Sequence, residues 1–221
     1  KKFGIREYYM IKVSNLSKKF GSHISLDNVS CEFKKNESIA LMGANGAGKT
    51  TLIRSILGYY HPTNGEVSIN GLDPIKHRTE VLENISFVPQ LPPPIKLNID
   101  ELLQYISISA KVDTDKIIHY ANEMKLDIKS NMNKSFFKLS GGMKQKLLIA
   151  ISLAKKSDII IYDEPTANLD PKARDDFYRL LEKNEHDKVL LFVTHRLEEV
   201  KDLVNRQIYM DLGKIVSDDR F

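Results

Sequence analysis

One stretch of the 221-residue sequence constrains the fold more than any other part. The apolar run Ser38 to Met42 leads into Gly43 to Thr50, which fits the pattern G-x-x-x-x-G-K-[ST], and a helical pattern follows from Lys49 to Leu57. A strand, a glycine-rich turn and a helix in this order are typical of a P-loop, whose backbone N–H groups surround a phosphate. The sequence therefore predicts an α/β fold that binds a nucleotide.

The residue types in this loop match that chemistry. Glycine permits close approach and unusual backbone angles, a lysine supplies a cation for the β- and γ-phosphates, and a threonine hydroxyl suits Mg²⁺. A chance match in a glycine-rich turn is the plain alternative. The residues expected to contact the nucleotide here are Gly43, Ala44, Asn45, Gly46, Ala47, Gly48, Lys49, Thr50 and Thr51.

A second acidic element supports the nucleotide site. Ile159 to Tyr162 reads as a buried strand and is followed directly by Asp163 and Glu164. Taken alone, this pair of carboxylates would be a solvated turn. Beside a P-loop, Asp163 is expected to hold Mg²⁺, and Glu164 to polarise the water that attacks the γ-phosphate.

From about Ile11 to Val216 the chain resembles the nucleotide-binding ATPase of ABC transporters. Walker A and Walker B are the two elements above, and five further motifs occur in the family's order. They are Phe20, which matches the adenine-stacking aromatic, Gln90 of the Q-loop, the signature loop Leu139 to Met143, the D-loop Ala167 to Asp170, and the switch histidine His195. The resemblance implies ATP and Mg²⁺, with Glu164, His195, Lys49 and Gln90 as catalytic residues and Thr50, Gln90 and Asp163 at the metal.

The signature loop offers a second anion site. Ser140, Gly141 and Gly142 precede the apolar helical run Leu147 to Ala154, and a helix N-terminus with small residues attracts phosphate. One nucleotide does not need two such sites from a single chain. The resemblance implies that these residues and Asp170 contact a nucleotide held by another protomer, whereas Ser140 and Asp170 could also simply cap their own helices.

Several motif residues have plain alternatives of their own. Gln90 could be an ordinary polar residue at a strand end, His195 a structural histidine, and Phe20 a core aromatic. Met143 replaces the glutamine common at the end of the signature, which removes one polar contact and leads us to expect altered affinity without loss of activity.

Composition is consistent with a protein of the cytosol. The chain is 42% hydrophobic, enough for one good core, and its net charge of +4 is scattered, so we expect no nucleic-acid partner. Cys31 is the single cysteine and reads as buried and inert. No apolar stretch reaches the roughly 20 residues that cross a bilayer. We expect a cytoplasmic subunit, peripheral on the membrane, whose transmembrane pathway belongs to a separate permease.

The resemblance predicts a P-loop core with a mostly parallel sheet, an antiparallel β layer and a helical subdomain. Short strands are expected between Ile11 and Phe33, a helical pattern at about 91–155 and a hairpin formed by residues 206–210 and 214–217. Residues 197–204 read as a helix. Residues 1–9 read as an N-terminal extension to an ATPase domain at 10–221.

The favoured interpretation is an ATPase that binds two Mg·ATP at the interface of a homodimer or a heterodimer of cassettes. A soluble ABC-type ATPase of translation or DNA repair, a P-loop kinase and a regulatory module are the alternatives. The stretch from Pro165 to Pro171 resembles exporters of the ABC-2 type, and two stretches at 197–200 and 210–213 resemble the ATPase of a permease that supports copper-centre maturation.

Overall fold

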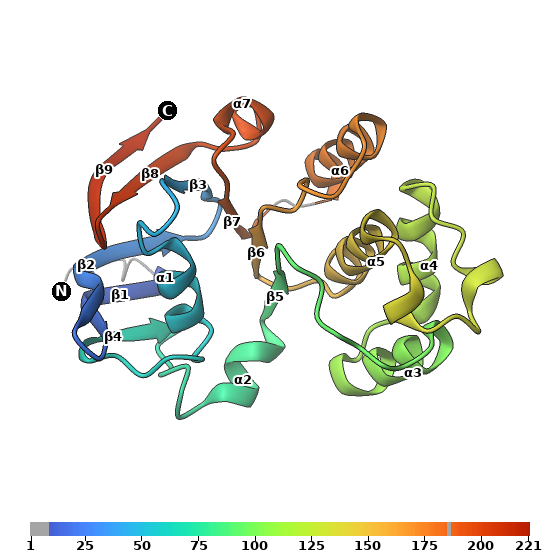
Figure 1. Ribbon diagram of the computed structural model, residues 1–221, viewed down its shortest axis with the longest axis horizontal. Coiled ribbons are helices and arrows are strands. Elements are labelled where there is room, and N and C mark those ends of the chain that lie inside the picture. Colours follow the sequence, from blue (N-terminus) through green and yellow to red (C-terminus); the bar gives the residue numbers. More distant parts are fainter. Residues whose placement is uncertain (1–8, 185–186) are drawn as a thin grey trace, which may run out of the picture. The chain divides into compact units, whose positions relative to one another are not determined.

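The computed structural model describes residues 9–184 and 187–221, which form two compact units (Figure 1). The first unit contains the described residues up to Ile85 and those from Asp187 onward; the second contains the described residues from Ser86 to 184. The predicted extension at residues 1–9 lies outside the described residues except for Tyr9, which begins the first strand.

An antiparallel sheet forms one layer of the first unit. Its strands are β1 (Tyr9–Phe20), β2 (His23–Lys34) and β4 (Asn64–Ile69), in the order β2-β1-β4. Val13 of β1 pairs with Cys31 and Val67 on its two sides, and all three side chains are buried. The antiparallel layer was expected, but β1 and β2 have 12 residues each, longer than the short strands predicted.

The first unit also holds a sheet segment of strands β7 (Val189–Val193), β3 (Ser38–Gly43), β8 (Arg206–Asp211) and β9 (Lys214–Arg220), in that order. Strand β3 runs parallel to both β7 and β8, and the predicted hairpin joins β8 to β9. The side chains of β7 are buried throughout, as expected for a parallel strand covered on both faces.

The described residues of this unit form three helices: α1 (Lys49–Ile56), α2 (Arg78–Glu83) and α7 (Leu197–Val200). Helix α1 starts at the predicted P-loop lysine. The prediction of a helix over residues 197–204 is only partly right, because α7 ends at Val200 and a hydrogen-bonded turn follows. Helix α2 has no counterpart among the predicted elements.

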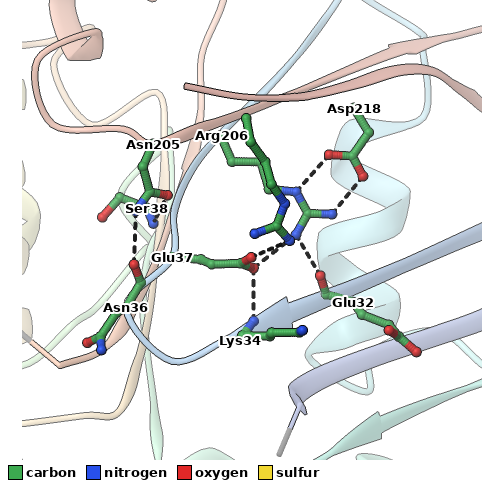
Figure 2. A network of polar contacts seen from close by, with 9 residues as sticks. Glu32, Lys34, Asn36, Glu37, Ser38, Asn205, Arg206 and Asp218 are labelled. Atoms are coloured by element: carbon green, nitrogen blue, oxygen red, sulfur yellow. Dashed lines mark hydrogen bonds and ion pairs between the residues drawn. The ribbon is translucent and has the colours of Figure 1, made fainter. Parts of the chain in front are cut away.

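A buried ion-pair network fastens the C-terminal hairpin to the rest of the unit (Figure 2). The Arg206 guanidinium donates to both carboxylate oxygens of Asp218, at 2.7 and 2.6 Å, and to Glu37 at 2.9 Å. A further bond reaches the carbonyl oxygen of Glu32 at 2.7 Å. Arg206 and Glu37 are almost fully buried, and each has a second charged partner, Asp218 for Arg206 and Arg220 for Glu37, so the network compensates both buried charges and constrains the position of β8.

The second unit combines helices with two neighbouring strands, β5 (Ile85–Val88) and β6 (Ile159–Asp163). Strand β5 begins at the last residue of the first unit. Its helices are α3 (Ile99–Ala110), α4 (Thr114–Glu123), α5 (Gly141–Ala154) and α6 (Pro171–Asn184), with short 3₁₀ turns at Lys129–Asn131 and Phe136–Lys138.

One hydrophobic core joins α3, α4 and α5, and it includes Leu103, Ile117, Phe136 and Leu147. The first helix of this region begins at Ile99, beyond Pro92 to Pro94, which lack the backbone N–H groups that a helix interior needs. Asn98 and Glu101 form a reciprocal capping box that fixes the start of α3.

Candidate nucleotide-binding site

Three glycines shape the loop between β3 and α1. Gly43, Gly46 and Gly48 have φ angles of 143°, 84° and 101°, a region that residues with a side chain seldom adopt. A Cβ atom at Gly43 would collide with the carbonyl oxygen of Met210, and one at Gly48 would lie 2.7 Å from that of Ser25, whereas Gly46 has open space around it. Gly43 and Gly48 must therefore be glycine because a Cβ atom has no room there, and the backbone conformation favours glycine at all three positions.

The tip of the loop is exposed to solvent. Residues 44–46 are exposed, Gly48 gives no side-chain cap to α1, and the first turn of α1 carries no acidic residue. The Lys49 ammonium donates to the carbonyl oxygens of Gly43 at 2.6 Å and Ala44 at 3.0 Å. This amine is thus held over the loop, where phosphate oxygens would replace carbonyl oxygens as its acceptors.

Thr50 and Thr51 follow Lys49 with different surroundings. Thr50 is exposed in the first turn of α1, so its hydroxyl is available to a metal ion. The Thr51 hydroxyl lies 2.7 Å from the Ser25 hydroxyl, which ties the start of α1 to β2. The β1–β2 hairpin is therefore anchored directly to the helix that follows the glycine-rich loop.

Phe20 ends β1 at this hairpin and pairs with His23 across it. Its side chain is 42% exposed, and its ring meets the Tyr60 ring edge-on, with centroids 5.1 Å apart at an angle of 76°. The alternative that Phe20 is a core residue is therefore wrong. The ring is a surface aromatic, as base stacking requires.

His195 lies beyond the carboxyl end of β7 and is exposed. Its Nε2 atom accepts a hydrogen bond from Nε of Arg196 at 3.4 Å. An exposed imidazole at the carboxyl edge of a parallel strand is placed where α/β proteins display functional groups.

In the second unit, β6 carries the two predicted carboxylates. Ile159 to Tyr162 are fully buried, and the strand ends at Asp163. Glu164 follows with φ of 48°, the left-handed region, which costs a glutamate free energy and is found preferentially at functional sites. Both carboxylate residues are half-buried, so the alternative of a fully solvated turn does not describe them.

The signature and the D-loop contact each other around Asn168. A Cβ atom at Gly142 would lie 3.0 Å from the Asn168 carbonyl oxygen, and the Asn168 side chain donates to the carbonyl oxygen of Gln90 at 3.4 Å. Gln90 itself is exposed after β5. The signature loop, the D-loop and the Q-loop thus meet at Asn168, which was not among the predicted site residues. Its only signal in the sequence was an amide side chain inside the D-loop motif.

Ser140 and Asp170 both cap helices, as their plain alternatives required. The Ser140 hydroxyl accepts from the N–H of Met143 at 3.2 Å at the start of α5. Asp170 accepts from the N–H of Ala173 at 3.0 Å at the start of α6, and this bond is the main cause that lowers the pKa of Asp170. Capping does not consume the oxygens of either side chain, so a second role remains open to each.

Comparison with known proteins decides the family. Residues 26–167, more than half of the sequence, match the ABC transporter family. The chain belongs to this family. Its fold is that of an ABC ATPase: 96% of the chain superimposes on an ATP-binding subunit of an ABC transporter with a TM-score of 0.85 at 23% identity, covering 90% of that chain.

Two relatives show how far the similarity of this ABC ATPase extends. The arginine transport ATP-binding protein ArtM of Bacillus subtilis is 33% identical, with 95% of this chain and 90% of ArtM aligned. The energy-coupling factor transporter ATP-binding protein EcfA2 of Clostridium perfringens is 32% identical, with 95% and 79% aligned.

A solved structure of a cassette shows the same fold with products bound. The dimeric post-hydrolysis state of the ATP-binding cassette MJ0796 with ADP and Pi has a TM-score of 0.84 and 29% identity over 96% of this chain and 98% of that one. In the described part of the chain, no helix is both long and apolar enough to cross a membrane.

The predicted residues divide between the two units. The P-loop, Phe20 and His195 belong to the first, and Gln90, the signature glycines, the two β6 carboxylates and Asp170 to the second. Among the described residues, no group of three His, Cys, Asp or Glu side chains could hold a metal ion. Thr50 in the first unit and Asp163 in the second each carry a hard oxygen of the kind that Mg²⁺ prefers.

Proposed function

We propose that this chain hydrolyses Mg·ATP as one half of a head-to-tail pair of ABC cassettes, and that the pair drives a separate membrane permease. The chain would act on the cytoplasmic face of the membrane. The support comes from the complete order of motifs and from the names of the relatives, which are ATP-binding proteins of transport systems.

One observation carries the pairing. The chain contains two helices that begin at loops of small residues, α1 behind Gly48 and α5 behind Ser140. Neither helix has an acidic residue in its first turn, so both N-termini favour an anion. A triphosphate bound by Lys49 of one copy would accept a hydrogen bond from the Ser140 hydroxyl of the other copy. Two copies would then form two equal sites.

Each residue then has one chemical task. Loop N–H groups and Lys49 bind and orient the β- and γ-phosphates, while Thr50 and Asp163 would hold Mg²⁺, which when bound neutralises phosphate charge. Glu164 accepts the proton of the attacking water, and His195 donates to the γ-phosphate. Gln90 responds to the same phosphate through its amide, and Phe20 stacks on the adenine.

The motion in this proposal starts at the Q-loop. Gln90 is followed by Leu91, which is 77% exposed, and by three prolines that stiffen the segment. Such a segment would carry a displacement from the nucleotide to the helices that follow. We include in this proposal that residues 91–155 form a helical subdomain.

The relatives include an arginine transporter and an energy-coupling factor transporter, and they support neither the ABC-2 resemblance nor the link to copper-centre maturation. A P-loop kinase would need an acceptor for the phosphate. Steady ATP turnover measured in the absence of any acceptor would therefore argue against a kinase.

The test is Glu164→Gln. This variant should bind Mg·ATP, turn it over very slowly and accumulate as a dimer, because the trapped γ-phosphate keeps both halves of the interface bound. Size-exclusion chromatography with light scattering measures the mass, and ADP in place of ATP is the control that should leave a monomer. A variant that stays monomeric with saturating Mg·ATP would contradict the pairing.

A further inference from the structure

Tyr60 lies at the centre of an aromatic and cationic cluster beside Phe20. It follows the C-terminal end of α1 and is half-buried. Its ring and that of Phe20 are 5.1 Å apart and nearly perpendicular, the edge-to-face arrangement that aromatic pairs favour. In an edge-to-face pair the edge of one ring meets a flat face of the other, so the pair covers at most one face of each ring.

Tyr60 is fixed to the phosphate-binding helix. The Arg54 guanidinium donates to the Tyr60 hydroxyl at 2.7 Å and also lies 5.8 Å from the centre of the ring. Arg54 belongs to α1, which begins at Lys49. The ring that touches Phe20 is thereby tied to the element that holds the polyphosphate.

Lys18 supports the pair from β1. Its ammonium donates to the carbonyl oxygen of His61 at 2.7 Å and lies 5.0 Å from the ring centre of Phe20 and 5.7 Å from that of Tyr60. A cation at this distance is attracted by both rings. Phe20 is thus contacted by a second aromatic ring and by a cation, while its side chain stays 42% exposed.

We propose that Tyr60 is a positioning residue for the nucleobase: it sets the place and tilt of the Phe20 ring relative to the P-loop. The inference rests on the proposed stacking of adenine on Phe20. A base can stack only if its platform lies at the right distance from the phosphates, and the chain from Lys49 through Arg54 and Tyr60 to Phe20 fixes that distance. Tyr60 therefore contributes to the affinity for the base and not to that for the phosphates.

The chain offers a matched control at the adjacent position. Tyr59 is also a tyrosine at the end of α1 and is 52% exposed, but its ring packs on the Arg78 guanidinium at 4.6 Å. Replacing Tyr59 removes a comparable surface aromatic without touching the contacts of Phe20.

The experiment compares two ligands of the same loop, Mg·ADP and Mg·pyrophosphate, by calorimetric titration of the full chain. Tyr60→Leu should weaken ADP binding by roughly two- to tenfold, the range expected from losing one aromatic pair, and leave pyrophosphate binding unchanged. Tyr60→Phe keeps the ring but loses the Arg54 hydrogen bond and should fall between wild type and Tyr60→Leu. Tyr59→Leu should bind both ligands like wild type.

Two outcomes would overturn the inference. Equal weakening of ADP and pyrophosphate by Tyr60→Leu would mean a general disturbance of α1, and unchanged ADP binding would mean that Tyr60 does not position the platform. Phe20→Leu separates this failure from failure of the stacking itself, because stacking predicts weaker ADP binding in that variant whatever Tyr60 does. The Phe20→Leu, Tyr60→Leu double variant should be less impaired than the product of the single effects, since both act through one ring.

Discussion

The Ser140 hydroxyl oxygen accepts the backbone N–H of Met143 at 3.2 Å. A hydroxyl has two acceptor lone pairs and one O–H donor, so this cap uses only acceptor capacity. The O–H of Ser140 remains able to donate to a phosphate oxygen. The capping interpretation and the phosphate-binding interpretation of the signature loop are therefore compatible in a single side chain.

Substitution at Ser140 separates the two roles. Ser140→Ala removes both and should cost about 1 kcal/mol of stability through the lost cap as well as most ATP hydrolysis. Ser140→Asp keeps a good cap and should retain the stability, but its negative charge opposes the γ-phosphate, so hydrolysis should be lost. Urea unfolding and phosphate release measure the two effects. Wild-type hydrolysis in Ser140→Asp would mean that this side chain only caps.

The two signature glycines should respond differently to a methyl group. At Gly141 an added Cβ atom would have ordinary room, with its nearest neighbour, the Asn168 side-chain oxygen, 3.8 Å away, whereas at Gly142 it would press on the Asn168 carbonyl oxygen at 3.0 Å. Gly142→Ala should therefore be less stable than Gly141→Ala by about 1 kcal/mol in urea unfolding. Equal unfolding free energies for the two variants would show that the D-loop moves away from the added methyl group without loss of stability.

Backbone strain at Glu164 predicts that one substitution can raise stability and remove activity at the same time. Its φ of 48° suits glycine better than glutamate. Glu164→Gly should raise the unfolding free energy by about 1 kcal/mol while abolishing hydrolysis, which denaturant titration and phosphate release measure in turn. A loss of stability in this variant would mean that contacts of the glutamate side chain outweigh the backbone strain.

Cys31 should be unreactive in the folded protein. Burial raises the pKa of its thiol from 9.0 to about 12, so little thiolate is present at neutral pH. Because the pKa of Cys31 is higher in the folded than in the unfolded chain, the contribution of its neutral thiol to the free energy of unfolding is complete below pH 9.0. This contribution is lost as the pH rises toward about 12. A thiol reagent should label Cys31 only after unfolding; fast labelling of the native chain at pH 8 would contradict this.

The sequence was sufficient for residues whose identity alone defines their environment. Gly43, Gly48 and Lys49 could be placed because few residue types allow a phosphate loop, and the buried run before Asp163 marked a strand by apolarity alone. The prolines after Gln90 were also visible as a stiff segment, and α3 begins beyond them at Ile99.

Contacts between distant segments could not be predicted. Asn168 touches Gly142 and Gln90, and Tyr60 touches Phe20, only because the folded chain brings them together. The end of α7 was missed for a related reason, since residues after Val200 continue a helical pattern but form a turn that leads into β8. Periodicity predicts elements, while tertiary contacts decide where they end.

Complementation between two inactive variants tests the shared site most directly. Lys49→Ala and Ser140→Ala each damage both sites of a pure dimer, but a mixed dimer contains one site with Lys49 from one copy and Ser140 from the other. Mixing equal amounts should restore ATP hydrolysis to at most about a quarter of wild type, because half of the dimers are mixed and each has one intact site. Activity no greater than the sum of the separate variants would contradict the shared site.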